Sequence, residues 1–185
     1  MLFIKEDGAV CLEDGENVII FPLKKEELDL LLELGDKSFS SYIGASYDGQ
    51  DVWDLDFLKI ANGKLDLLEK DVSFWEWDTI WLIVSARHKK IVGDLHFASS
   101  PIEGKCEISL NLNPKYNGQG ITTSALSLIE KWAFQNGANC LFLNCNTENE
   151  ELIRSLDKNG FELIKNENKV CCYQKNKIIK FEREK

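Results

Sequence analysis

The sequence is short of basic charge. It holds 22 Lys and Arg against 31 Asp and Glu, a formal net charge of −9 over 185 residues. A protein that binds nucleic acid generally needs a basic surface, so this deficit argues against nucleic acid as a partner. Apolar runs also fall far short of the ~20 residues that span a bilayer, and residues 2–4 are too few for the apolar part of a leader. We therefore expect no membrane segment and no nucleic-acid partner.

Histidine is scarce as well, with two residues in the chain, and none of the six cysteines forms a C-x-x-C pair. This composition argues against a structural zinc site, and we expect no metal. Cysteines outside such pairs indicate reduced thiols, which favours a cytoplasmic location. A hydrophobic fraction of 44% in a chain of this length is enough for one core without disulfide bonds.

The pattern of helices and strands predicts a mixed α/β sheet rather than a purely alternating one. We expect a helix over residues 24–34 that ends at Gly35, and another over 51–61 that breaks at Asn62-Gly63 before residues 64–69. From residue 79 the spacing predicts the following succession: strands 79–86, 91–98 and 105–113, a helix from Ile121, strand 141–144, a second helix, and strands 161–165 and 170–174.

Residues 105–113 alternate regularly between apolar and polar side chains. Glu107, Ser109 and Asn111 fall on the polar face, and Leu110 and Leu112 fall on the apolar one. On the preceding strand, Asp94 and His96 share the face opposite Leu95. These polar faces hold the candidate acid–base residues of the chain.

A Gly-x-Gly loop, Gly118-Gln119-Gly120, separates this strand from an amphipathic helix. Glycines let the backbone approach a ligand closely, and the first turn of a helix presents unpaired N–H groups and a positive dipole end. Thr122 and Thr123 add hydroxyl groups there. The junction therefore suits a pyrophosphate without needing lysine, although a plain tight turn has the same pattern. It lacks the third glycine of a dinucleotide-binding loop and the Gly-Lys-Ser/Thr of a Walker A loop.

The segment Leu126 to Phe134 is similar to the RimJ/RimL-like branch of the GNAT N-acetyltransferase superfamily, and three segments in order resemble the superfamily itself. They are the strand Glu107-Ile-Ser-Leu-Asn-Leu-Asn-Pro114, the loop Tyr116-Asn-Gly-Gln-Gly-Ile-Thr122, and Asn149-x-x-Leu-Ile-Arg-Ser-Leu-Asp-Lys-Asn-Gly-Phe161. The resemblance implies a mostly antiparallel mixed sheet flanked by helices and splayed between its two central strands. It also implies one domain over residues 1–185, with a coenzyme-binding core at 79–175 and strands and helices of residues 1–78 over the acceptor side.

The resemblance further implies acetyl-CoA as the co-substrate. The backbone of Leu110 and Leu112 would hold its pantetheine arm. The residues implied for the rest of the coenzyme are Asn117, Gly118, Gln119, Gly120, Ile121, Thr122, Thr123 and Asn149. Asn117 stands where the family usually has Arg or Gln, and Thr122 where it has Gly or Ala. These two departures keep open an alternative function, a non-catalytic acetyl-CoA-binding sensor or interaction module.

The activity implied is direct transfer of acetyl to a primary amine, either a protein N-terminus or a small amine. The ammonium must first lose a proton, and Glu107 is the predicted base, with Asp94 and His96 as secondary candidates. The acidic balance of the chain favours a cationic acceptor. The sequence leaves open whether residues 1–78 cover the acceptor site or form the contact of a homodimer.

Overall fold

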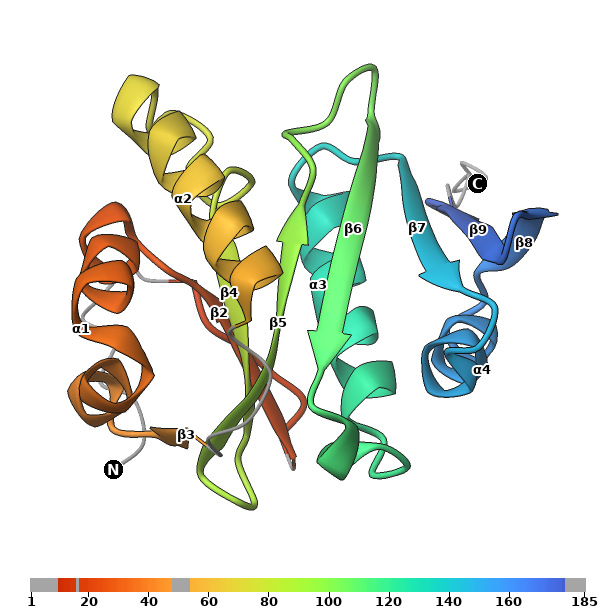
Figure 1. The fold of residues 1–185 in the computed structure, drawn as a ribbon. Helices are drawn as coiled ribbons and strands as arrows, with labels where there is room; N and C mark the ends of the chain where they lie inside the picture. Colours follow the sequence, from red (N-terminus) through yellow and green to blue (C-terminus); the bar gives the residue numbers. More distant parts are fainter. Residues whose placement is uncertain (1–9, 16, 48–53, 179–185) are drawn as a thin grey trace, which may run out of the picture.

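The computed structural model describes residues 10–15, 17–47 and 54–178. Figure 1 shows their helices and strands, which are β1 (Leu12–Glu13), β2 (Val18–Pro22), α1 (Lys25–Ile43), β3 (Ser46–Tyr47), α2 (Leu55–Lys70), β4 (Ile80–Ser85), β5 (Lys90–Phe97), β6 (Lys105–Leu112), the 3-10 turn η1 (Pro114–Tyr116), α3 (Ile121–Gln135), β7 (Cys140–Asn146), α4 (Glu150–Lys158), β8 (Glu162–Glu167) and β9 (Val170–Asn176). The expected start of the second helix, at 51–53, lies outside the described residues. No helix in the described ranges is both long and apolar enough to cross a bilayer.

One sheet runs through the described chain in the order β1-β2-β4-β5-β6-β7-β9-β8, and β3 joins it by pairing with β5. Neighbouring strands are antiparallel except for β6–β7 and β3–β5. The predicted mixed, mostly antiparallel fold is confirmed. The parallel β6–β7 pair is possible because α3 supplies the long crossover between the two strands.

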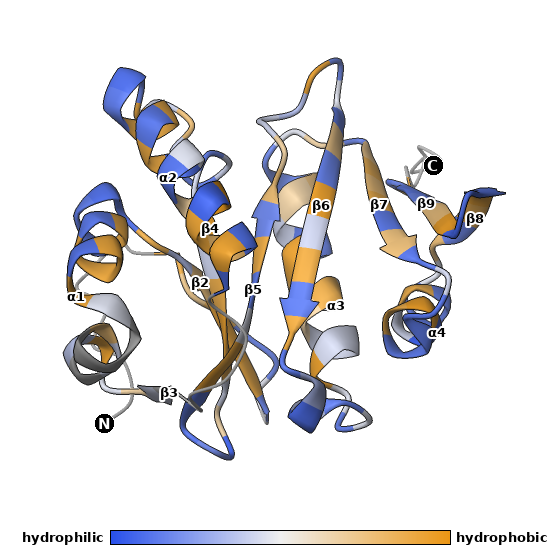
Figure 2. Ribbon diagram, viewed as in Figure 1, coloured by the Kyte–Doolittle hydropathy of each residue, from blue (hydrophilic) through white to orange (hydrophobic). Residues whose placement is uncertain are grey.

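Helices cover both faces of the sheet. On one face α1 and α2 pack over Phe21, Leu82 and the other apolar residues that β2 and β4 turn towards them. On the other face α3 packs over Trp81 and Leu95 through an apolar side that includes Ile129. The alternation predicted for β6 is visible in Figure 2. Its apolar side chains join the α3 layer, so its polar side chains face the α2 side.

The two central strands β6 and β7 pair over only three residues each. Their register begins at Lys105 opposite Cys140 and ends at Glu107 opposite Phe142. β7 stays paired with β9 along its whole length. Beyond the last β6–β7 pair, the two strands diverge (Figure 1). The splay predicted between these strands is thereby confirmed.

Two helices were expected to be interrupted at a glycine, and only the first of them is. The chain leaves helical geometry at Gly35, with φ 69° and ψ −179°, as predicted, but a further helical segment follows to Ile43. The predicted break at Asn62-Gly63 is wrong, because α2 continues through both residues. The Asn62 amide donates to the carbonyl of Leu58 at 2.7 Å, so this asparagine caps no helix end. Burial of Phe57, Ala61 and Leu68 on one side of α2 outweighs the modest cost of a mid-helix glycine.

Candidate active site

The opening between β6 and β7 forms part of a cleft of about 750 Å³. Its walls come from the start of α2, the end of β5, β6 and the turn after it, the first turn of α3, and the segment that joins β7 to α4. The divergence of β7 from β6 opens one side of this cleft, and α2, which packs on one face of the sheet, forms the other side. Segments far apart in the sequence therefore contribute to one site.

The backbone of β6 faces the cleft at Leu110 and Leu112. The N–H of Asn113 donates to Val92 on the β5 side, and the carbonyl of Glu107 accepts from Ala98 there. Because backbone groups alternate in direction along a strand, those of Leu110 and Leu112 point the other way, towards the splay. No β7 residue stands opposite them in the described register. Both residues line the cleft, so this strand edge is available to an extended ligand.

The Gly-x-Gly loop leads directly into α3. Gly118 and Gly120 have φ values of 75° and 78°, a conformation that favours glycine, and a Cβ at either position would meet nothing within 4 Å. Gly120 is the N-cap of α3 and offers no side-chain hydrogen bond to the first turn. The N–H groups of that turn therefore lack a capping side chain, which leaves them for an anion.

The predicted coenzyme residues divide into two groups. Leu110, Leu112, Asn117, Thr122 and Asn149 all line the cleft. Gly118 lines an adjoining hollow of about 460 Å³, which shares Asn117 and Asn149 with the cleft.

The other predicted coenzyme side chains point elsewhere. Gln119 contacts the Nε2 atom of His88 at 3.2 Å, and Thr123 donates to the Ser155 hydroxyl at 3.1 Å. Ile121 is buried in the core. These residues, together with Gly120, can contribute backbone groups to the loop but do not line the cleft.

Thr122 and Asn149 show how the cleft residues are held. Thr122 is 2% exposed, and its Oγ1 has no hydrogen-bond partner among the described residues. Asn149 is the N-cap of α4 and accepts a hydrogen bond from the N–H of Leu152 at 3.2 Å. Its capping role and its place on the cleft therefore coexist. The unpartnered hydroxyl of Thr122 favours a polar ligand at the start of α3.

Glu107 lies at the closed end of the splay, where β6 and β7 are still paired. Its Oε1 accepts a hydrogen bond from the side-chain amide of Asn144 at 2.8 Å, which links the two strands just past their last backbone pair. The cleft lining contains Ser109 but not Glu107. Glu107, the predicted base, is therefore the neighbour of a cleft residue on the same face of β6 but does not itself line the cleft.

His96 lines the cleft, and Asp94, two residues earlier on the same face of β5, does not. The Nδ1 atom of His96 is 4.0 Å from Oδ2 of Asp94, and the two residues are 9% and 1% exposed. Burial lowers the pKa of His96 to about 4 and raises the pKa of Asp94 to about 7. The alternation around Leu95 was the sequence signal for both, but it carried no information about their burial.

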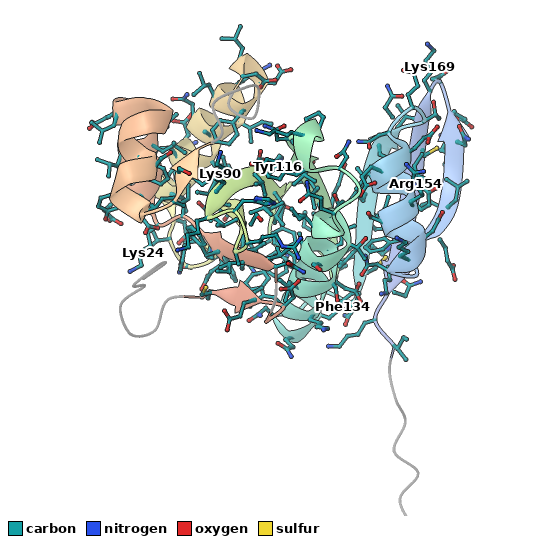
Figure 3. The ribbon with its side chains drawn as sticks, turned by 90° about the horizontal axis from the view of Figure 1, so that it is seen from below. Lys24, Lys90, Tyr116, Phe134, Arg154 and Lys169 are labelled. Carbon is teal, nitrogen blue, oxygen red and sulfur yellow. The ribbon has the colours of Figure 1, made fainter. Side chains whose placement is uncertain are left out.

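Carboxylates dominate the charge around the cleft. Asp54 and Asp56 line it from the start of α2, and Glu148 and Glu151 line it from the other side. The described lining contains no lysine or arginine. Arg154 lines the adjoining hollow and lies 3.6 Å from Glu150, on the side of the molecule opposite Lys24 (Figure 3). The described residues hold no cluster of His, Cys, Asp and Glu that could bind a metal ion.

A family model for the acetyltransferase (GNAT) domain matches residues 17–162. The chain belongs to the GNAT acetyltransferase family. No curated protein sequence matches it at a significant level. The family match covers the strand, loop and helix on which the sequence resemblance rests, and it also includes α1 and α2.

Solved GNAT structures share this fold. Ribosomal-protein-S5-alanine acetyltransferase from Vibrio fischeri has a TM-score of 0.63 at 15% identity, over 90% of this chain and 96% of its own. RimL, a ribosomal L7/L12 alpha-N-protein acetyltransferase, has a TM-score of 0.60 at 16% identity, over 95% and 99%. PseH from Campylobacter jejuni, solved with acetyl coenzyme A, has a TM-score of 0.54 at 15% identity, over 87% and 99%. These neighbours confirm the predicted GNAT fold.

The GNAT cleft of this chain has the features that acetyl-CoA requires. An exposed strand edge at Leu110 and Leu112 suits the amides of a pantetheine arm, and the uncapped first turn of α3 suits a pyrophosphate. The carboxylates at 148, 150 and 151 face the same loop and would repel phosphate. Arg154 is the one basic side chain among the described residues of this hollow, so three carboxylates and one guanidinium surround the loop there.

Proposed function

We propose that the protein transfers an acetyl group from acetyl-CoA to the amino group of an acceptor by direct attack. One observation carries this proposal: the splay exposes the backbone of β6 in the same cleft that receives the uncapped start of α3. An extended thioester could lie along β6 with its phosphates at the loop. The acetyl group would then sit inside the cleft, where an amine can reach it.

In this proposal the backbone of Leu110 and Leu112 holds the pantetheine arm. The pyrophosphate is held by the loop from Asn117 through Gly118, Gln119 and Gly120, by the first turn of α3 at Ile121, Thr122 and Thr123, and by Asn149. Residues 79–175 thus form the coenzyme-binding core of a single domain. The α2 side of the cleft, from residues 1–78, is the acceptor side.

The acceptor is a cationic amine in this proposal. The carboxylates of Asp54, Asp56, Glu148 and Glu151 attract an ammonium group, and the overall charge of −9 adds to the same field. The neighbours RimL and the S5-alanine enzyme are named for ribosomal proteins, so a protein N-terminus belongs among the acceptors to test. Six free cysteines support a cytoplasmic location as part of the proposal.

The test begins with calorimetric titration of acetyl-CoA, followed by turnover on a panel of amines. The panel should contain monoamines, diamines and peptides with neutral, acidic or basic N-terminal sequences. Products should be detected by mass spectrometry, since the free thiols of the protein would react with thiol reagents. Micromolar binding with acetylation of a cationic amine is the expected result. Absence of acetyl-CoA binding up to millimolar concentration would overturn the proposal.

A second candidate, a non-catalytic acetyl-CoA-binding module, is favoured by the loop itself. Asn117 provides a short neutral side chain where the family carries a long donor, and glutamates at 148, 150 and 151 surround it. Such a module would bind acetyl-CoA without acetylating any member of the amine panel. The same two measurements therefore separate the enzyme from the binding module.

A further inference from the structure

We propose that His96 accepts the proton from the acceptor amine and that Asp94 positions its ring. This assignment rests on the proposed acetyl transfer and names the acid–base pair that serves it. It replaces Glu107, the base that the resemblance implies, with a histidine from the neighbouring strand.

The position of His96 comes from the register of three strands. His96 lies opposite Ile80 of β4 and opposite Ser109 of β6, and directly opposed residues of antiparallel strands share a face. Ile80 packs against α1 and α2, so His96 is on the α2 side of the sheet, which is the proposed acceptor side. His96 and Ser109 both line the cleft, at the level where β6 has parted from β7.

The two ring nitrogens of His96 have different surroundings. Nδ1 is fully buried with no hydrogen-bond partner among the described residues, and Oδ2 of Asp94 is its nearest carboxylate oxygen, at 4.0 Å. Oδ1 of Asp94 also lacks a partner. Because Nδ1 is buried on the Asp94 side, Nε2 is the nitrogen that can meet a group in the cleft. At 4.0 Å Asp94 makes no hydrogen bond to the ring, so it acts through its charge: the ionised carboxylate favours the position of the ring that brings Nδ1–H nearest and stabilises positive charge when Nε2 takes a proton.

Charged groups reach this pair from one neighbouring helix. From α2, Lys64 lowers the pKa of His96 and Asp54 raises the pKa of Asp94, each adding to the larger effect of burial. Lys64 donates to the carbonyl of Phe97 at 2.6 Å, so its ammonium stays near the pair.

The neighbouring strands add no charge directly opposite the pair. β4 presents Ile80 and Leu82, and β6 presents Ser109 and Asn111, with Glu107 two residues before Ser109 on the same face. A hydrogen bond to Asn111 lowers the pKa of Asp94, against the larger effect of burial. Near pH 7 His96 is neutral and Asp94 is close to half-ionised. Its low pKa makes His96 a weak base while Asp94 is protonated, so it can take the amine proton only when Asp94 is ionised and the negative charge raises the proton affinity of the ring.

The reaction balances with this pair as the base. The acceptor ammonium gives one proton to Nε2 of His96, and the freed lone pair forms a C–N bond to the thioester carbonyl carbon. The C–S bond then breaks, and the departing sulfur takes the second amine proton to leave as coenzyme A thiol. His96 finally releases its proton to solvent. The ionised carboxylate of Asp94 stabilises the imidazolium during the first step.

Kinetics of three variants test the assignment. His96→Gln should lower kcat by about 100-fold or more, the usual range for a general base, and leave the Kd for acetyl-CoA unchanged. In the wild-type protein kcat should rise with pH through an apparent pKa near 7, because Asp94 must ionise. Asp94→Asn should remove this rise, which a purely structural role would not do. A larger loss in Glu107→Gln, with His96→Gln within threefold of wild type, would overturn the assignment.

A measurement on the wild-type protein covers the case in which a variant does not fold. Nuclear magnetic resonance of the imidazole rings, assigned with a His88→Asn variant, should show His96 neutral down to about pH 5, with a shift near pH 7 from Asp94. A His96 ring that titrates near 6.5 would contradict the buried pair. Failure of the wild-type protein to acetylate any amine would overturn the proposed function, whereas turnover that survives His96→Gln overturns only this assignment.

Discussion

Asp94 and His96 should have opposite effects on how stability depends on pH. Asp94 has a folded pKa of about 7, above its ordinary 3.8, so its contribution to the free energy of unfolding falls as pH rises through that window. His96 has a folded pKa of about 4, below its ordinary 6.5, so its contribution falls as pH decreases from 6.5 to 4. Between pH 4.5 and 6.5 the two slopes largely cancel in the wild-type protein.

Single variants should expose each slope. With His96→Gln the free energy of unfolding should fall more steeply with rising pH than in wild type, and with Asp94→Asn it should rise, each by up to about 1.4 kcal/mol per pH unit. Urea unfolding at several pH values measures this. All other titrating groups are common to the three proteins, so the comparison isolates the pair. Parallel pH profiles for all three proteins would refute the burial of these two groups.

Asn117 should limit the affinity for acetyl-CoA. Asn117→Arg returns the long donor usual in the family and adds positive charge beside Glu148 and Glu151. A charge-assisted hydrogen bond contributes about 1.5–3 kcal/mol, so we expect a Kd lower by about tenfold or more in calorimetry. Gln119→Arg is the matched control, because it adds the same charge to the same loop from a side chain that points to His88. Equal tightening by both variants would mean that the net charge matters and the position does not.

At the level of single residues, the sequence pattern predicted on which face of the sheet a side chain lies but not how deeply it is buried. Alternation placed Asp94, His96 and Glu107 on polar faces, and the structure agrees. Asp94 and His96 are buried on the strand that α2 contacts through Lys64 and the carbonyl of Phe97, whereas Glu107 bonds to Asn144 of β7. The ranking of the three candidate bases therefore depended on contacts that periodicity does not contain.

Two glycines in different elements should respond oppositely to alanine. Gly63 lies in the middle of α2 with nothing within 4 Å of a new Cβ, so Gly63→Ala should stabilise the protein by about 0.5–1 kcal/mol. Gly93 lies in β5, and a Cβ there would be 2.2 Å from the carbonyl oxygen of Asn111. Gly93→Ala should cost about 1–3 kcal/mol, because β5 must move away from β6. Urea unfolding of both variants checks this, and a loss in Gly63→Ala would mean that α2 does break there.

Helices and strands were predicted best where one pattern was strong. The alternation of β6 and the apolar side of α3 gave the right element types, because packing of a single face determines them. The supposed break in α2 was wrong because glycine disfavours a helix by only about 1 kcal/mol, which is less than the packing of Phe57 and Leu68 against the sheet contributes.

For the molecule as a whole, family resemblance supplied what local pattern could not. The parallel pairing of β6 with β7 and its end at Glu107 bring together residues more than 30 positions apart. No periodicity encodes such a register, and the splay was expected only because the strand, loop and helix resemble GNAT proteins. The acidic lining of the cleft was likewise invisible until α2 and the β7–α4 segment met across it.

Salt should affect the two substrates in opposite directions. The protein carries a net charge of −9, and glutamates line the hollow at the loop, so polyanionic acetyl-CoA binds against the overall field. Added salt screens that repulsion, since the Debye length falls from about 30 Å at 0.01 M to about 8 Å at 0.15 M. Calorimetry at these two ionic strengths should show a lower Kd for acetyl-CoA at the higher one. The KM of a cationic acceptor should rise over the same range. If acetyl-CoA instead binds more weakly at high salt, basic side chains such as Arg154 must dominate its site.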